Sequence, residues 1–168
     1  MYLLVIRHAI AEDRDEFART GSNDDERPLT PFGKRRMRRN AVGLRRTASH
    51  IELLAASPLV RAQQTARIVA AEFQLHDIET IEALRPDRHP RELLAWLAKQ
   101  SSDATIAVVG HEPHVGALVT WCVSGSESSG IVFKKGGAAL IQFEGKPAGG
   151  SGRLHWFVTP AQLRNLAE

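Results

Sequence analysis

Along this chain, short apolar runs alternate with longer stretches of helical spacing, and this alternation restricts the fold more than any other feature of the sequence. Residues 2–6 form a continuous apolar run with β-branched members that ends abruptly at Arg7 and His8, and two further apolar runs lie at 51–55 and 105–109. Such runs are typical of strands whose two faces are both covered. Strands that alternate with helices imply parallel pairs joined by right-handed crossovers. The sequence therefore predicts an α/β fold with a mostly parallel sheet.

The predicted helices have local start signals. Thr30 and Pro31 form an N-cap and a first-turn proline for a helix that we expect to end near Thr47, and Gly33 lets its first turn approach another backbone closely. Further helices are predicted at 59–73, 90–99 and 113–123. A short strand is predicted at 78–84, and alternating strands at 138–143 and 153–158 give the C-terminal side of the sheet antiparallel character. Residues 10–27 are expected to form a long polar loop with room for one helical turn.

The overall composition is that of a globular protein. With 168 residues, 43% of them hydrophobic, the chain is expected to form a single domain over 1–168. Cys122 is the single cysteine and has apolar neighbours, which indicates a buried thiol in a reducing compartment. The N-terminus begins directly with a predicted strand, without a charged leader or a long apolar segment. We therefore expect a cytoplasmic protein that is not exported and does not span a membrane.

The basic residues are clustered, although the net charge is only +3. The cluster comprises Lys34, Arg35, Arg36, Arg38, Arg39, Arg45 and Arg46. Because aromatic residues are not interleaved with these side chains, we favour a solvated helix face that steers anionic substrates. Nucleic acid or another polyanion is the alternative partner.

Each of the three buried runs delivers chemically active residues at its carboxyl end. The first ends at Arg7 and His8, the second is followed by Ser57 and then Arg61, and the third ends at His111. In a mostly parallel sheet these ends meet at one edge, toward which helix N-termini also point. Arginines give forked donors for phosphate oxygens, and a neutral imidazole can attack phosphorus. The pattern predicts a phosphoryl-transfer pocket that needs neither a metal nor a cofactor.

Four segments, in this order, resemble the signatures of the histidine phosphatase superfamily. They are Arg7-His8-Ala9, Leu29-Thr30 with Gly33, Ser57-Pro58-Leu59-Val60-Arg61-Ala62-Gln63-Gln64-Thr65-Ala66, and Gly110-His111-Glu112-Pro113. The resemblance spans nearly the whole chain and implies a three-layer α/β/α sandwich. It also implies that His8 is the nucleophile that forms a phosphohistidine intermediate, while Arg7, Arg61 and His111 bind the phosphoryl oxygens.

Within the superfamily, the compact size, the short segment 71–104 and the pattern Leu84-x-Pro86 before a helix resemble the SixA-type phosphohistidine phosphatases. Larger members insert a helical lid in that segment, and this chain has no room for one. The resemblance implies an open groove that admits a phosphorylated side chain of another protein, such as a phosphorelay or phosphotransferase component. For His8 to attack, its second ring nitrogen must donate to a fixed acceptor such as a backbone carbonyl.

The proton donor has no clear match in the sequence. Glu82 is a loose positional counterpart of the glutamate that larger relatives use, and Glu79, Asp87 and Glu112 are rivals. The P–N bond of a phosphohistidine is labile and needs less acid catalysis than a phosphate ester, so a weak acid favours phosphohistidine as the substrate. Ala9 stands where the signature has glycine, a difference of one methyl group.

Several other polar and aromatic residues have structural interpretations. None of the remaining histidines has metal-ligand spacing, so no metal is expected; they are His50, His76, His89, His114 and His155. The tryptophans lie in apolar contexts that are typical of packing or groove lining; they are Trp96, Trp121 and Trp156. His114 is predicted either at the pocket rim or exposed. Lys134 and Lys135 either face the phosphate edge or protect a sheet edge, and we favour the second role.

Four functions remain in competition. The leading one is hydrolysis of phosphohistidine on a protein, and the second is hydrolysis of a small phosphorylated metabolite or nucleotide. A third is a noncatalytic module that binds phosphoproteins, against which the intact His8 argues. The last is a polyanion binder that uses the basic helix, whose binding would weaken steeply with salt.

Overall fold

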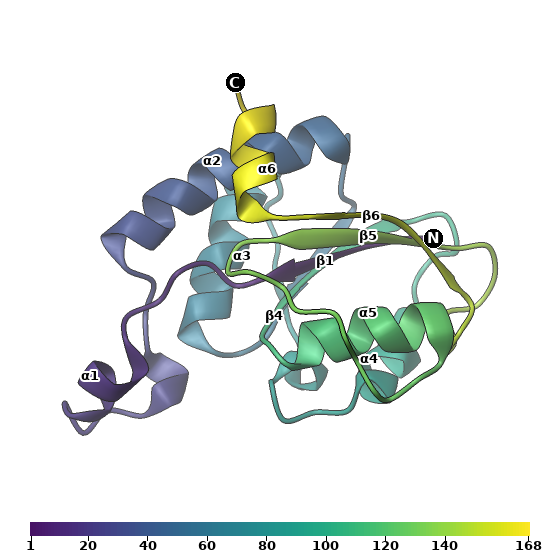
Figure 1. The fold of residues 1–168 in the computed structure, drawn as a ribbon. Coiled ribbons are helices and arrows are strands. Elements are labelled where there is room, and N and C mark those ends of the chain that lie inside the picture. The colour runs from purple at the N-terminus through teal and green to yellow at the C-terminus, as the bar shows by residue number, and fades with distance from the viewer.

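The computed structural model describes residues 1–168, and its centre is a six-stranded sheet with the order β3-β2-β4-β1-β5-β6 (Figure 1). The strands are β1 (Tyr2–Arg7), β2 (Leu53–Ala56), β3 (Glu79–Thr80), β4 (Thr105–Gly110), β5 (Ala138–Phe143) and β6 (Gly152–Val158). The first four strands pair in parallel, β1 with β4, β4 with β2 and β2 with β3. β5 is antiparallel to β1, and β6 is antiparallel to β5. The predicted mostly parallel sheet with an antiparallel C-terminal side is confirmed.

Helices cover both faces of the sheet (Figure 1). They are α1 (Arg14–Ala18), α2 (Pro31–Thr47), α3 (Val60–Phe73), α4 (Pro90–Leu97), α5 (His114–Ser124) and α6 (Pro160–Leu166), with 3₁₀ turns η1 (Asp24–Glu26) and η2 (Glu82–Leu84). Buried residues of α2, α3 and α6 form one apolar cluster, and those of α4 and α5 form the other. The expected three-layer sandwich is therefore observed.

Burial of β1 on both faces explains why its sequence is a continuous apolar run. Leu4 and Ile6 belong to the cluster under α2 and α3, whereas Leu3 and Val5 belong to the cluster under α4 and α5. All four side chains are fully buried. Since burial of one such side chain stabilises the fold by about 1.5–3 kcal/mol, alternate residues of β1 fix both helical layers to the same strand.

The start of α2 is held against the backbone that leaves β1. The Thr30 Oγ1 accepts a hydrogen bond from the Gly33 N–H at 2.9 Å, which confirms the predicted N-cap. A Cβ at Gly33 would lie 2.0 Å from the carbonyl oxygen of Ile10. Gly33 therefore makes the close backbone approach that the sequence predicts, and it fixes the segment that follows His8.

The structure differs from the prediction at two places. The strand predicted at 78–84 is only Glu79–Thr80, because these two exposed edge residues are followed by the turn η2. A helix that the sequence analysis did not predict, α6, follows β6 and begins with a capping box between Thr159 and Gln162. α6 packs on α2, where a Cβ at Gly43 would lie 1.9 Å from the Leu163 carbonyl oxygen.

Two further sequence predictions concern burial and membranes. Cys122 is a free and buried thiol, as predicted, and burial raises its pKa to about 12. None of the helices combines the length and the apolar character that crossing a membrane requires.

Candidate active site

The carboxyl ends of β2, β4 and β1 meet at one edge of the sheet. β1 and β4 run in register from Tyr2 opposite Thr105 to Arg7 opposite Gly110, and the His8 N–H continues the ladder to the Gly110 carbonyl at 2.9 Å. A cavity of about 450 Å³ opens at this edge. Its lining consists of Arg7, His8, Ala11, Glu12, Asp13, Arg14, Arg27, Arg61, Pro86, His111, Glu112 and Lys135. The sequence predicts that four residues accept or bind the phosphoryl group, and all four line this cavity: Arg7, His8, Arg61 and His111.

The His8 ring is held in one tautomer. Its Nδ1 lies 2.7 Å from the Ala9 carbonyl oxygen, which can only accept, so Nδ1 carries the ring proton and donates it. Burial lowers the pKa of His8 to about 3; the hydrogen bond to Ala9 opposes that shift, and the charges of Arg61 and Arg7 add to it. The ring is therefore neutral at pH 7, with an unprotonated Nε2. The Ala9 carbonyl oxygen is thus the fixed backbone acceptor that nucleophilic attack by His8 requires.

The backbone after His8 is tied to α3. The Ala9 N–H donates to the Thr65 Oγ1 at 3.0 Å, and the Thr65 hydroxyl donates to the Arg61 carbonyl at 2.7 Å. The Ala9 methyl is 3% exposed and belongs to the apolar cluster under α2 and α3. The methyl that replaces the signature glycine therefore packs in the core.

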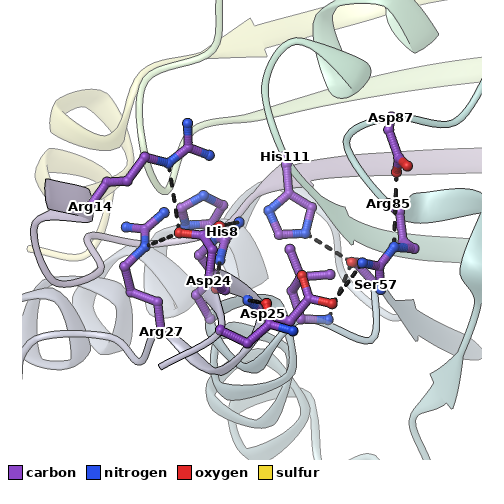
Figure 2. Close-up of polar contacts among 12 residues, drawn as sticks. His8, Arg14, Asp24, Asp25, Arg27, Ser57, Arg85, Asp87 and His111 are labelled. Carbon is purple, nitrogen blue, oxygen red and sulfur yellow. Dashed lines mark hydrogen bonds and ion pairs between the residues drawn. The ribbon is translucent and has the colours of Figure 1, made fainter. Parts of the chain in front are cut away.

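His111 lies beside His8, with 5.0 Å between the ring centroids (Figure 2). Its Nε2 is 2.9 Å from the Ser57 Oγ, and that oxygen also accepts from the Leu59 N–H at 3.4 Å. The Ser57 hydroxyl can donate to this ring nitrogen or accept from it, and either bond orients the His111 ring. Burial, followed by the neighbouring charges of His8 and Arg61, lowers the pKa of His111 to about 2. The His111 ring is therefore neutral at pH 7.

The two predicted arginines each have one buried nitrogen without a hydrogen-bond partner. Arg61, in the first turn of α3, donates from Nη1 to the Asp24 carbonyl at 2.8 Å and pairs through Nη2 with the Asp24 Oδ2 at 3.1 Å. Arg7 donates from Nη1 to the Phe133 carbonyl. The buried Nε atoms of both arginines and the Nδ1 of His111 have no hydrogen-bond partner. Because a buried N–H without a partner is costly, these donors favour binding of an anion at the cavity.

Three cationic side chains of the cavity were not singled out from the sequence as site residues. Arg14, Arg27 and Lys135 line it together with Arg7 and Arg61. Lys135 corrects the prediction that its turn protects a sheet edge, because β5 lies inside the sheet between β1 and β6. The turn faces the phosphate edge instead. The cavity is thus lined by five cationic side chains.

The carboxylates are arranged differently from the sequence expectation. Glu82 does not line the cavity: its side chain is 67% exposed and its Oε2 lies 3.9 Å from the Arg85 Nε. β3 ends early, and the following turn η2 places Glu82 toward solvent. Of its rivals only Glu112 lines the cavity, and its Oε1 accepts from the Phe133 N–H at 2.6 Å. The cavity also contains Glu12 and Asp13.

His114 contradicts both of its predicted positions. It is 2% exposed, it does not line the cavity, and neither ring nitrogen has a partner. Burial lowers its pKa to about 4. No group of three or more His, Cys, Asp or Glu side chains is arranged to hold a metal ion.

The amino-acid sequence is similar to one family of known proteins. Residues 3–86 match the model of the histidine phosphatase superfamily (branch 1). An uncharacterized protein of Picosynechococcus is 34% identical over 151 residues, which are 84% of this chain and 89% of that protein. The phosphohistidine phosphatase SixA of Escherichia coli is 27% identical over 167 residues, 98% of this chain and 97% of that one.

The solved structures agree with the sequence comparison. The protein histidine phosphatase SixA complexed with tungstate has a TM-score of 0.83 at 27% identity, covering 97% of this chain and 99% of that one. A phosphoserine phosphatase of Entamoeba histolytica has a TM-score of 0.66 at 19% identity, covering 96% and 98%, and so shares the fold.

Proposed function

This chain belongs to the histidine phosphatase superfamily, and from that premise we propose that it is a metal-independent phosphatase in which His8 accepts the phosphoryl group. The observation that carries the proposal is the neutral His8 ring, fixed by the Ala9 carbonyl in a cavity lined by five cationic side chains. A neutral, oriented imidazole is a competent nucleophile, and fixed cations stabilise the charge of a transferring phosphoryl group.

The reaction proceeds in two displacements at phosphorus. The His8 Nε2 forms a bond to phosphorus while the bond to the leaving group breaks, and Arg7, Arg61 and His111 hold the phosphoryl oxygens. Water then attacks the phosphohistidine, inorganic phosphate leaves, and the His8 Nε2 recovers its lone pair. The leaving group of the first step takes up one proton, and the attacking water releases one in the second.

The proposed substrate is phosphohistidine on a protein, such as a phosphorelay or phosphotransferase component. Support comes from the end-to-end similarity to SixA and from the carboxylates. Glu82 lies outside the cavity, and Glu112 is engaged by the Phe133 N–H, so a strong and free acid is lacking among the expected donors. A labile P–N bond tolerates that lack better than a phosphate ester does.

A small phosphorylated metabolite or nucleotide is the second candidate substrate. The observation in its favour is that Glu12 and Asp13, which were not among the expected donors, also line the cavity, and either one could protonate an alkoxide leaving group. We also propose that residues 1–168 form a single domain. We further propose a cytoplasmic location, which is supported by the buried free thiol of Cys122.

The test is a substrate comparison in the presence of EDTA. Purified protein is incubated with a phosphohistidine peptide and with a panel of phosphate esters, alongside His8→Ala and, as a matched control, His76→Ala, whose histidine is exposed and outside the cavity. We expect phosphohistidine to be hydrolysed fastest, His8→Ala to be inactive and His76→Ala to match the wild type. Faster hydrolysis of an ester would select the second candidate, and no turnover with any substrate would overturn the phosphatase proposal.

A further inference from the structure

The carboxylate of Asp24 contacts three of the arginines that line the cavity, and Figure 2 shows two of them, Arg14 and Arg27. The Asp24 Oδ1 lies 2.7 Å from the Arg27 Nε and 3.6 Å from the Arg14 Nε. The Asp24 Oδ2 lies 3.1 Å from the Arg61 Nη2. Asp24 itself is not among the residues that line the cavity.

Asp24 holds Arg61 at two points. Its backbone carbonyl accepts from Nη1 at 2.8 Å, and its carboxylate pairs with Nη2. Because the guanidinium group is planar and rigid, two contacts fix its orientation. Both terminal nitrogens are engaged by one residue, and the Nε is left without a partner. Asp24 therefore holds both terminal nitrogens of an arginine that lines the cavity.

Asp24 also neutralises part of a buried cationic cluster. The side chain of Arg61 is 3% exposed and that of Arg27 is 8% exposed, so repulsion between them is poorly screened. Burial by itself would raise the pKa of Asp24, but the hydrogen bond from Arg27 and the charge of Arg61 lower it below its usual value. Asp24 is thus ionised at pH 7 and keeps the two guanidinium groups together.

We propose that Asp24 is a positioning residue for phosphoryl transfer, which orients Arg61 and Arg27 around the phosphoryl group without contacting it. The inference rests on the proposed function and deepens it, since it assigns a role to the loop between β1 and α2. Loss of the Asp24 charge leaves Arg61 and Arg27 in the cavity but no longer fixes the orientation of their guanidinium groups. Ground-state binding of phosphate is then retained, while stabilisation of the transition state is reduced.

The neighbouring Asp25 provides a matched control. It lies on the same turn η1, its side chain has the same 38% exposure, and it pairs with the Arg85 Nη2 at 2.6 Å. Arg85 does not line the cavity. If these carboxylates merely anchor the turn, the loss of either one should have the same consequence.

The kinetic test compares Asp24→Asn, Asp24→Glu and Asp25→Asn with the wild type. We expect Asp24→Asn to lower kcat about 10- to 100-fold, from the loss of charged hydrogen bonds to Arg61 and Arg27. The dissociation constant of inorganic phosphate, measured by titration calorimetry, should change less than about threefold, because retained charge dominates phosphate binding. Asp24→Glu should recover part of kcat, and Asp25→Asn should keep it within about twofold.

A second readout does not depend on turnover. The Nε–H signal of Arg61 in a nitrogen-15 NMR spectrum, assigned by its loss in Arg61→Lys, should be resolved in the wild type and in Asp25→Asn. It should disappear by averaging in Asp24→Asn. An unchanged signal in Asp24→Asn, or an equal fall of kcat in Asp24→Asn and Asp25→Asn, overturns the inference. Failure of the proposed function is a separate result, because it is seen as absence of turnover in the wild type while the Arg61 signal still decides the role of Asp24.

Discussion

Two walls of the cavity are built by different physical means. The strand-end wall carries His8, His111 and Arg61, and each of these residues is at most 5% exposed. The loop wall, residues 12–27, extends away from the body of the molecule at α1, and neither α1 nor η1 contains a buried residue (Figure 1). Ion pairs of Asp24 and Asp25 hold this loop in place.

The difference separates two requirements of the proposed reaction. A nucleophile and its oxygen-binding partners need fixed geometry, which a packed core provides. The outer part of the loop wall depends less on packing, since a partly exposed ion pair such as that of Asp25 with Arg85 contributes about 1 kcal/mol or less. We therefore expect substitutions in the strand-end wall to affect turnover strongly, and substitutions in the outer part of the loop wall to affect it weakly.

Among substitutions that keep the His8 nucleophile, the largest expected effect on turnover comes from Arg61→Lys in the strand-end wall. Lysine keeps the positive charge but lacks the planar group that Asp24 holds, so kcat/KM should fall about 10²-fold. Arg67→Lys, on the exposed side of the same helix α3, is the control and should match the wild type. Equal activity of Arg61→Lys and Arg67→Lys would mean that charge alone suffices at this position.

The pH range in which stability is lost should differ between the buried histidines and the loop wall. His8, His111 and His114 have folded pKa values lowered by burial to about 3, 2 and 4. Between these values and the unfolded pKa, the unfolded chain binds more protons, so stability is full above about pH 6.5 and falls as the pH decreases. We expect a loss of about 2 kcal/mol for each histidine between pH 7 and pH 5, measured by urea unfolding.

His114→Leu sharpens that measurement. It removes a buried histidine outside the cavity, so the slope of unfolding free energy against pH should decrease while turnover is unchanged. The loop wall should contribute only at lower pH, because the pKa of Asp24 is lowered below its usual value and its stabilisation is lost as the pH falls through that range. A flat profile between pH 7 and pH 5 would contradict the neutral, buried state of the three rings.

A smaller effect is expected for Ser57→Ala. The change removes the hydroxyl that orients the His111 ring through Nε2, so kcat/KM should fall about tenfold. Ser102→Ala, at an exposed position, is the control. Activity of Ser57→Ala within about twofold of the wild type would mean that packing alone orients His111.

The smallest effect is expected in the outer part of the loop wall. Asp25→Asn removes one half-exposed ion pair with Arg85, and the free energy of unfolding should change by less than about 1 kcal/mol. Urea unfolding at low and at high salt provides the check. A larger loss would show that the loop wall depends on this pair as strongly as the other wall depends on its core.

How much of this the sequence predicts also differs between the walls. The strand-end wall can be predicted from local sequence patterns, since an apolar run followed by Arg7-His8 or by His111 identifies both the strand and the residue at its end. The loop wall depends on contacts between residues far apart, such as Asp24 with Arg61, which are 37 positions apart. Lys135 reaches the cavity only because β5 pairs with β1.

The remaining differences have local causes. The exposed pair Glu79 and Thr80 forms too short a ladder for the predicted strand, so the chain turns and carries Glu82 away from the cavity. The signal for α6 was present as Thr159, Pro160 and Gln162, but the helix has only seven residues and is stabilised by packing on α2. Tertiary contacts decided both cases.

The most direct test of the central claim is to trap the phosphorylated enzyme. Wild-type protein and His8→Ala are mixed with substrate, quenched during turnover under alkaline denaturing conditions that preserve phosphohistidine, digested and analysed by mass spectrometry. We predict an acid-labile phosphoryl group on the peptide that contains His8, and none in His8→Ala, which should also be inactive. Phosphorylation at another residue, or continued turnover by His8→Ala, would contradict the assignment of His8 as the nucleophile.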